Sequence, residues 1–376
     1  MAKRVTGITV EINGENLTIT LEAVCDSFSS LLWDVEYYQC GSFEIYIAAT
    51  SENLRTFQKD RIIGRSDDKR HYGIIEKIQL NADAENGDYL TVSGRFLMCI
   101  LERRIIYPTL FFTSEKTYAE IVREAVHNNC MKRGDGLVRM IPRLKLGGIS
   151  GKCWENKTCL QISYANLMEW IYKICEIIGG TANMRLQSEE NGGFSLIFDL
   201  SEGMDRSVLQ DENQHIIFSD LYNNLLSFDY ALDYSKYRNF AYILGSGEGT
   251  ERKRTIFYNG DKVPQLLERY EVYVDAKDLS NEVQTNGVST EISKSEYTAI
   301  LKQRGAENLV PVTEKSESTI AVNNRQYQYN KDYFVGDYVT VQHKRFGLSQ
   351  PKIQLVGMIE SFDRNGRNLT PTFKIH

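Results

Sequence analysis

The sequence predicts an α+β protein that is mainly β, with a strand-rich block at each end of the chain and a mixed block between them. Apolar residues alternate with polar ones over much of both ends, which is the period of a half-buried strand. Two stretches in the middle place apolar residues at helical spacing. The 376 residues include 22 Tyr and 16 Phe but only 6 Pro, and aromatic residues are enriched in strands and at packed interfaces.

The first hundred residues are predicted to form short antiparallel strands. Alternating runs lie at 8–12, 17–21, 43–47, 71–80 and 89–94. Asn13 and Gly14 form a dipeptide typical of a tight hairpin turn, and a second polar turn lies at 86–88. About six strands with no helix between them indicate a small barrel or sandwich.

The period changes in the middle of the chain, where two helices are predicted. Thr117 and Glu120 form a capping box at the start of the first helix. The second helix covers 167–178 and ends at Gly179 and Gly180. Two strands are predicted at 181–187 and 194–200, and a glycine-rich loop at 145–152.

Strand patterns return in the last block. They lie at 225–245, 254–258, 270–274, 319–322, 338–343, 353–362 and 372–375. A short helix is predicted from Ser293, which forms a capping box with Glu296 and directs Tyr297, Ile300 and Leu301 inward.

No pattern of catalytic, cofactor-binding or metal-binding residues emerges from the sequence. The net charge of −6 offers no basic surface for nucleic acid. The cysteines form no C-x-x-C pair, so we interpret them as buried free thiols in a reducing cytoplasm. The histidines lack metal-ligand spacing. The glycines of 245–250 precede a strand rather than the helix that a phosphate loop needs, which predicts a hairpin turn.

Two kinds of active site leave no sequence signature and stay open. A Cys/His nucleophile pair would meet in space rather than in sequence. A glycosidase needs only two carboxylates, but nothing distinguishes Glu155 and Glu169, the pair that one would nominate, from solvated surface residues.

The chain shows no targeting or membrane segment. The N-terminus lacks the apolar core of a signal peptide, and the apolar runs at 96–101 and 174–178 are too short to span a bilayer. We therefore expect a protein that is made soluble in the cytoplasm, has no membrane-spanning segment and is exported only as part of a larger object.

Two stretches of the sequence carry distinctive motifs. The first has the patterns G-x-I-E, V-x-G-R and L-x-R-R between residues 73 and 104. The second reads D-Y-x-x-G-D-x-V-x-V at 332–341 and would place a turn before a strand. These stretches resemble siphophage and prophage tail-hub proteins, and the residues that carry the resemblance are Gly94, Arg95, Arg103, Arg104, Asp332, Tyr333, Gly336 and Asp337.

The resemblance implies two tube-type antiparallel β-barrel domains with a lateral α+β module. Three subunits would form a ring whose six barrels have pseudo-sixfold symmetry and match a hexameric tail tube. The first barrel would comprise 1–107, the lateral module 108–222 together with 262–308, and the second barrel 223–261 and 309–376. Trp170 is expected to be buried in the module, against its own two strands.

The resemblance also implies a non-enzymatic structural role without a cofactor, as the hub that closes the tail tube at the virion tail tip. The expected partners are two more copies of the chain, the distal tail or tail-tube ring, the tape-measure protein, and a tip, fibre or receptor-binding protein. DNA is expected only in transit, through a channel that does not hold it. Many such hubs continue into a peptidoglycan hydrolase, whereas this sequence stops after the last predicted strand. A tail-tip cell-wall hydrolase or peptidase and a carbohydrate-binding adhesin module remain as alternatives.

Overall fold

The computed structural model describes residues 5–13, 16–25, 27–83, 85, 87–132, 139–190, 193–285, 288–311, 313–320 and 326–374. The protein is mainly β with few helices, as the sequence predicts. The α-helices are α1 (Ser51–Thr56), α2 (Tyr118–Cys130), α3 (Leu167–Ile178) and α4 (Lys294–Ala306). None of the helices in the described ranges has the length and apolar character needed to cross a membrane.

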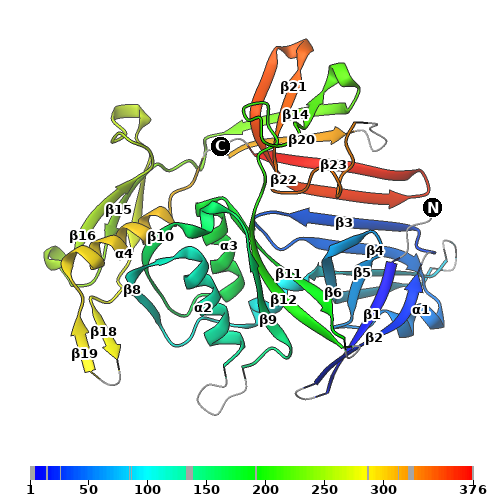
Figure 1. Ribbon diagram of the computed structural model, residues 1–376, viewed down its shortest axis with the longest axis horizontal. Helices are drawn as coiled ribbons and strands as arrows, with labels where there is room; N and C mark the ends of the chain where they lie inside the picture. Colours follow the sequence, from blue (N-terminus) through cyan, green and yellow to red (C-terminus); the bar gives the residue numbers. More distant parts are fainter. Residues whose placement is uncertain are drawn as a thin grey trace.

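Strands from both ends of the chain form one sheet of 13 strands, on the right of Figure 1. The first half contributes β1 (Val5–Asn13), β2 (Asn16–Cys25), β3 (Ser30–Glu36), β4 (Ser42–Ala48), β5 (Ile62–Arg65), β6 (Asp68–Asn81) and β7 (Tyr89–Phe96). The second half contributes β13 (Ile217–Ser219), β14 (Leu225–Asp233), β20 (Thr313–Ile320), β21 (Tyr338–His343), β22 (Leu348–Asp363) and β23 (Gly366–Lys374). The order is β14-β20-β23-β22-β3-β4-β7-β6-β5-β1-β2, while β21 pairs with β22 and β13 pairs with β21.

The long strand β22 joins the two halves of this sheet. It pairs antiparallel with β3, from Gly357 opposite Glu36 to Phe362 opposite Leu31. The same strand pairs with β21 and β23 of its own half. One 16-residue strand therefore belongs to the hydrogen-bonded framework of both halves.

The alternation that predicts strands in the first half also produces its core. Every second residue of β3 and β4 is buried, while the residues between them lie on the opposite face. The buried members are Leu31, Trp33, Val35, Phe43, Ile45 and Ile47. Helix α1 interrupts this block, which was predicted to contain no helix; it is a six-residue helix that buries none of its side chains and so leaves no apolar stripe to detect.

The middle of the chain forms a helical module beside the large sheet (Figure 1). Its strands are β8 (Leu110–Thr117), β9 (Leu144–Ile149), β10 (Lys157–Ile162), β11 (Gly180–Ser188) and β12 (Phe194–Glu202). The predicted capping box at Thr117 is present, and α3 ends at Gly179 as predicted. Trp170 is 2% exposed and lies in one core with the residues of α2, α3, β11 and β12, which confirms its predicted burial.

The loop predicted at 145–152 is wrong, because β9 runs parallel to β12 there. Of the glycines that suggested a loop, Gly147 is needed where the two strands approach. A Cβ on Gly147 would lie 2.4 Å from Cγ2 of Ile197 and 2.1 Å from Oδ1 of Asp199. The amide of Gly148 donates a 2.7 Å hydrogen bond to the same Asp199 oxygen.

A smaller unit lies at the left of Figure 1. It contains β15 (Phe240–Leu244), β16 (Arg254–Tyr258), β17 (Glu271–Asp275), α4 and the hairpin of β18 (Glu282–Thr285) and β19 (Val288–Glu291). The segment 245–250 connects two antiparallel strands, β15 and β16, as its predicted hairpin turn requires. The predicted capping box of α4 is present, and Tyr297, Ile300 and Leu301 are buried.

The grouping of strands differs from the expectation that 223–261 belong to the second barrel. Of these residues, β14 joins the large sheet, whereas β15 and β16 form a separate sheet with β17. The reason is that Ala241 and Ile243 of β15 are buried in the core that α4 covers. Conversely, β13 lies within 108–222 but pairs with β21 of the large sheet. The remaining predicted residues Gly14, Asn86, Val322 and Ile375 lie outside the described residues.

Candidate functional site

The first four motif residues support the sheet and the short 3-10 helix that follows β7. Gly94 lies where β6 approaches so closely that a Cβ would sit 1.9 Å from the carbonyl oxygen of Ile74. Arg95 forms ion pairs with Glu76 (2.8 Å) and Glu102 (2.6 Å).

The two arginines at the end of this 3-10 helix (Leu97–Arg103) bind partners outside it. Arg103 pairs with Asp60 at 2.8 Å. The guanidinium group of Arg104 donates to the carbonyl oxygen of Arg139 at 2.9 Å, and its own carbonyl accepts from the amide of Leu167 at 3.0 Å. Arg104 therefore connects the first half to the start of α3.

The second four motif residues build the loop before β21. Asp332 accepts a 2.7 Å hydrogen bond from the amide of Gln328. The ring of Tyr333 is buried, with its centroid 5.4 Å from that of Phe218. Gly336 has a φ of 104°, in the region that favours glycine.

Asp337 fixes the same loop to the module. Its carboxylate accepts from the amides of Met204 (2.9 Å) and Phe334 (3.1 Å) and pairs with Arg206 at 2.8 Å. Burial raises the pKa of Asp337, and these hydrogen bonds and the Arg206 charge lower it only in part. The two motifs thus lie in different halves of the sheet and do not converge on one chemical centre.

What brings the parts of the chain together is a contact that we call the Tyr37 junction, formed by Tyr37, Gly179, Thr181, Gly203 and Gly336. The hydroxyl of Tyr37 donates to the carbonyl of Gly179 (3.1 Å) and accepts from the amide of Gly203 (2.9 Å). Thr181 donates to the carbonyl of Tyr37 at 2.5 Å. The Tyr37 ring also fills the space beside Gly336. Burial raises the pKa of Tyr37 well above its ordinary value.

The next residue extends this junction to the second half. The hydroxyl of Tyr38 donates to Oε1 of Gln354 at 2.7 Å, and Nε2 of Gln354 donates to the carbonyl of Gly336 at 3.0 Å. Tyr37 and Tyr38 follow β3 directly, so the end of one strand is bound to both the module and the second half.

The two halves of the sheet are also connected by ion pairs. We call the residues that form them the buried ion cluster: Arg65, Asp67, Glu360 and Arg367. Arg65 pairs with Glu360 (2.8 Å) and with Asp67 (2.8 Å), and Arg367 also pairs with Glu360. The side chains of Arg65 and Glu360 are 1% and 0% exposed. Burial alone would lower the pKa of Arg65, but the hydrogen bonds to Asp67 and Glu360 raise it, so the arginine stays charged.

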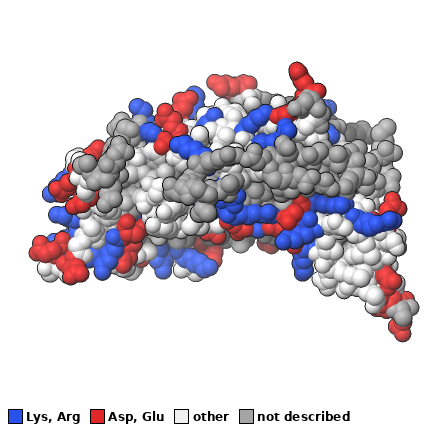
Figure 2. Space-filling model, turned by 90° about the horizontal axis from the view of Figure 1, so that it is seen from below, with Lys and Arg blue, Asp and Glu red and all other residues white. Residues whose placement is uncertain are grey.

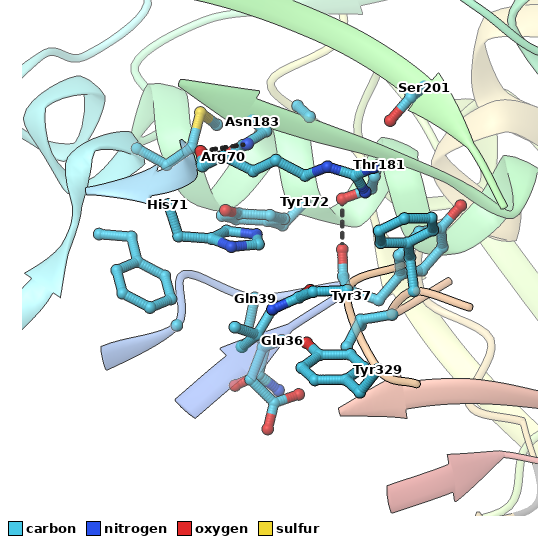
Figure 3. Close-up of a pocket in the computed structure, with 18 residues that line it drawn as sticks. Glu36, Tyr37, Gln39, Arg70, His71, Tyr172, Thr181, Asn183, Ser201 and Tyr329 are labelled. Carbon is cyan, nitrogen blue, oxygen red and sulfur yellow. Dashed lines mark hydrogen bonds between the residues drawn. The ribbon is translucent and has the colours of Figure 1, made fainter. Parts of the chain in front are cut away.

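A cavity of about 120 Å³ lies beside the Tyr37 junction (Figure 3). Its labelled lining residues come from β3 and the turn after it, β6, α3, β11, β12 and the loop before β21. Pockets for drug-sized ligands are typically about 300–1,000 Å³. The space fits a few water molecules rather than a polymeric substrate.

The one histidine of this cavity is held by its neighbours. Nδ1 of His71 lies 2.8 Å from Oδ2 of Asp68, which also accepts a 3.1 Å hydrogen bond from Nε1 of Trp33. The His71 ring packs on Phe96, with centroids 5.3 Å apart. Burial raises the pKa of Asp68, but the charge and hydrogen bond of His71, the amide of Arg70 and the charge of Arg65 together outweigh burial and hold this pKa below the ordinary range.

A wider hollow, which we call the linker cleft, measures about 590 Å³ and lies between α3 and the segments 234–238 and 306–311. It contains two carboxylates. Glu176 pairs with Lys374 at 2.8 Å, and burial raises the pKa of Glu307, which lies 3.7 Å from Arg304. Over the described ranges no cluster of His, Cys, Asp or Glu could hold a metal ion.

The sequence motifs identify Gly336 and Asp337 but miss Tyr37, Gln354, Arg65 and Glu360. Their partners are far away in the sequence, and a buried Glu in an alternating strand looks like an exposed one until the strand pairing is known. No local signal identifies them.

Comparison with known proteins agrees with the architecture. The model of the siphovirus ReqiPepy6 Gp37-like protein family matches residues 9–373. No curated protein sequence matches the chain. The fold is similar to that of the tail protein from Neisseria meningitidis MC58, with a TM-score of 0.58 and 14% identity over 100% of this chain and 97% of that one.

Two prophage proteins are similar in the same way. The 43 kDa tail protein of prophage MuSo2 from Shewanella oneidensis has a TM-score of 0.54 and 10% identity, over 99% of this chain and 97% of that one. The prophage tail protein gp18 from Listeria monocytogenes EGD-e has a TM-score of 0.53 and 10% identity, over 100% and 95%. At such identities the likeness shows a shared fold.

Proposed function

Because this chain belongs to the siphovirus ReqiPepy6 Gp37-like family of phage tail proteins, we propose that it is the hub that closes the tail tube at its tip. Its place among the structural proteins of the virion tail follows from the family and from the tail proteins that share its fold. We propose further that it lies at the tail tip, forms a homotrimeric ring and has no enzymatic role.

The observation that carries the proposal is the pairing of β22 with β3. It makes the two halves one sheet, whose longest row of paired strands ends at β14 and β2 in the described residues, while β13 ends a side branch beyond β21. An unpaired end strand is an aggregation risk for a soluble monomer. Closed cyclic symmetry removes both ends at once, because β14 of one subunit would meet β2 of the next. Two halves in each of three subunits would give the six barrels of a ring.

The exposed face of this sheet is suited to a channel wall. We call it the open face: Leu32, Asp34, Ser42, Glu44, Lys77, Ser93, Arg95 and Ile359, which line a shallow hollow of about 420 Å³ across β22, β3, β4, β7 and β6. Both signs of charge are present, and Arg95 is already paired with Glu76 and Glu102. Such a wall would bind few phosphates, so DNA would pass rather than stick.

One further face of the described residues carries charges of both signs as well. Figure 2 shows Lys and Arg interspersed with Asp and Glu on the face seen from below. With a net charge of −6 per chain, a trimer would be acidic. The tube or distal tail ring on one side, the tape-measure protein inside and a tip or fibre protein on the other side are the partners we propose.

Oligomeric state and particle images test this proposal. Light scattering at high protein concentration should give a species of about 130 kDa, three times the 43.2 kDa of the chain. Images of assembled tails should show a ring at the tip with threefold symmetry and the open face toward the axis. A strict monomer in the assembled tail would rule out the hub.

One observation favours cell-wall hydrolysis as a second candidate. Glu307 and Glu176 both line the linker cleft, and burial raises the pKa of Glu307. A carboxyl group with a raised pKa is what a general acid requires. A zymogram of the full chain on cell walls, with Glu307→Gln beside it, decides between the candidates. Lysis that disappears in Glu307→Gln would establish the hydrolase, and no lysis by either chain supports the structural role.

A further inference from the structure

The outer face of the small sheet presents an ordered aromatic surface. Tyr242 on β15 stands opposite Ile256 on β16 and Tyr273 on β17, so the three side chains form one row across the sheet. They are 41%, 42% and 57% exposed. Helix α4 packs on the opposite face. We call this row, with Leu266 and Leu267, the tyrosine face.

Arginines hold both tyrosine hydroxyls in place. Arg269 donates to the hydroxyl of Tyr242 at 2.6 Å, pairs with Glu271 at 2.8 Å and lies 3.6 Å above the ring of Phe240.

Tyr273 is held in the same manner. Arg252 donates to its hydroxyl at 3.1 Å and pairs with Asp275 at 2.6 Å. Because these rings are fixed in advance, a partner would lose little side-chain entropy on binding them.

Two leucines in the short turn that directly precedes Arg269 are almost fully exposed to water. Leu266 and Leu267 are 93% and 94% exposed. Their turn is anchored, since the side chain of Asn239 donates to the carbonyl of Glu268 at 2.8 Å. Leu266 has a φ of 49°, which is uncommon for a residue with a branched side chain. A fixed turn that displays two leucines is suited to an apolar pocket in another protein.

We propose that the tyrosine face docks a separate tail-tip protein that offers an apolar pocket with a polar rim. Tyr and Arg are enriched at the centres of protein interfaces. Adjacent exposed leucines favour a protein pocket over a sugar, which would stack on the tyrosines but leave the leucines in water.

The size of the face indicates how the partner binds. The three strands span two spacings of about 4.8 Å, and the five residues of each strand span four rises of about 3.4 Å, so the face covers roughly 10 by 14 Å. A stable binary interface needs about 800 Å² on each partner, so one face is too small, whether for a single protein or a second copy of this chain. This step rests on the proposed trimer: three equivalent faces bound together gain affinity through effective concentration. The partner therefore has threefold symmetry itself, or its binding segments are joined so that they reach all three faces.

The double substitution Leu266→Ser and Leu267→Ser tests the inference in assembled tails. Quantitative mass spectrometry of purified tails should show one component reduced at least tenfold relative to this chain, with tube proteins unchanged. Leu209→Ser is the matched control, because Leu209 is 65% exposed and follows Val208, whose amide is bound to Thr340 of the large sheet rather than to the small one. The melting temperature of each purified variant should equal that of the wild type.

Images of the same tails separate the two proposals. A threefold ring whose tyrosine face is covered by another protein, lost in the double variant, supports the inference. A threefold ring overturns the inference if its tyrosine face is bare, contacts a second copy of the chain or is bound to glycan. The proposed hub function is unaffected by these three outcomes. Absence of the ring overturns the proposed hub function. In that case, loss of a tail component from the double variant still supports docking at the tyrosine face, and no loss overturns it.

Discussion

The ring of Tyr37 occupies the space that a side chain at position 336 would need. An ideal Cβ on Gly336 would lie 2.2 Å from Cε2 of Tyr37, although the two residues belong to different halves of the sheet. Any larger residue at 336 therefore meets two obstacles, the positive φ of the loop and the aromatic ring from the other half.

Gly336→Ala should destabilise the protein more than Gly366→Ala does. Both glycines have a positive φ, 104° and 119°, but a Cβ on Gly366 meets nothing within 4 Å. Each substitution carries about 1–2 kcal/mol for the backbone conformation, and overlap with Tyr37 adds roughly 1–3 kcal/mol at 336. Urea unfolding of both variants measures the difference. Equal losses would show that the Tyr37 contact is unimportant, and Gly336→Val should be worse still and prevent assembly.

Glu360→Ala should cost about 3–5 kcal/mol of unfolding free energy, because it removes the buried carboxylate that pairs with Arg65 and leaves this buried charge only the partly exposed Asp67. The matched control is Asp278→Ala, which breaks an exposed pair with Arg304 and should cost at most ~1 kcal/mol. Thermal unfolding of both variants is the measurement. A similar small effect for the two would mean that the buried ion cluster does not hold the halves together.

The stability of the protein should fall in acid because of Asp68. Its pKa is lower in the folded state than the ordinary value near 3.9. Such a carboxylate contributes stability that is complete above the unfolded value and is lost as the pH falls through the folded value. Asp68→Asn should therefore differ most from the wild type near neutral pH and approach it below about pH 4. Denaturant unfolding from pH 7 to pH 2 tests this, and parallel curves would refute it.

Duplex DNA should not bind the wild-type oligomer in a gel shift at about 50 mM salt, where electrostatic binding is strongest. Glu44→Lys, on the open face, should create retention that disappears as salt rises, with a slope of roughly 0.9 for each lysine that reaches a phosphate. Glu190→Lys, in the exposed turn after β11, is the control and should change little. Salt-sensitive binding by the wild type would contradict a channel that lets DNA pass.

Local patterns in the sequence predict α2, α3, α4 and most of the strands, but not α1. The capping boxes at Thr117 and Ser293 and the helix end at Gly179 are local chemistry, so they can be read without the fold. Strand β9 could not be predicted, because its two glycines look like a loop until Asp199 is known to lie beside them. The separate sheet of β15 to β17 was missed because its place depends on α4, about fifty residues later.

The candidate site depends even more on distant contacts. The D-Y-x-x-G-D pattern identifies the loop that carries Gly336, yet nothing in the sequence indicates that Tyr37 packs against it. Arg65 and Glu360 are 295 positions apart. They meet because Arg65 lies over the ring of Trp33 and the pairing of β22 with β3 places Glu360 opposite Trp33. Long-range strand register, rather than local preference, decides these contacts.

The sharing of β22 also has a mechanical consequence. A pull that separated the two halves along the strand direction would load the β22–β3 hydrogen bonds together, in shear, rather than one after another as in unzipping. Since β22 is also paired with β21 and β23, the load would spread into the second half without passing through a loop. The two halves should thus move as one rigid plate, and bending under force should be confined to the loops that connect the small unit with β14 and β20.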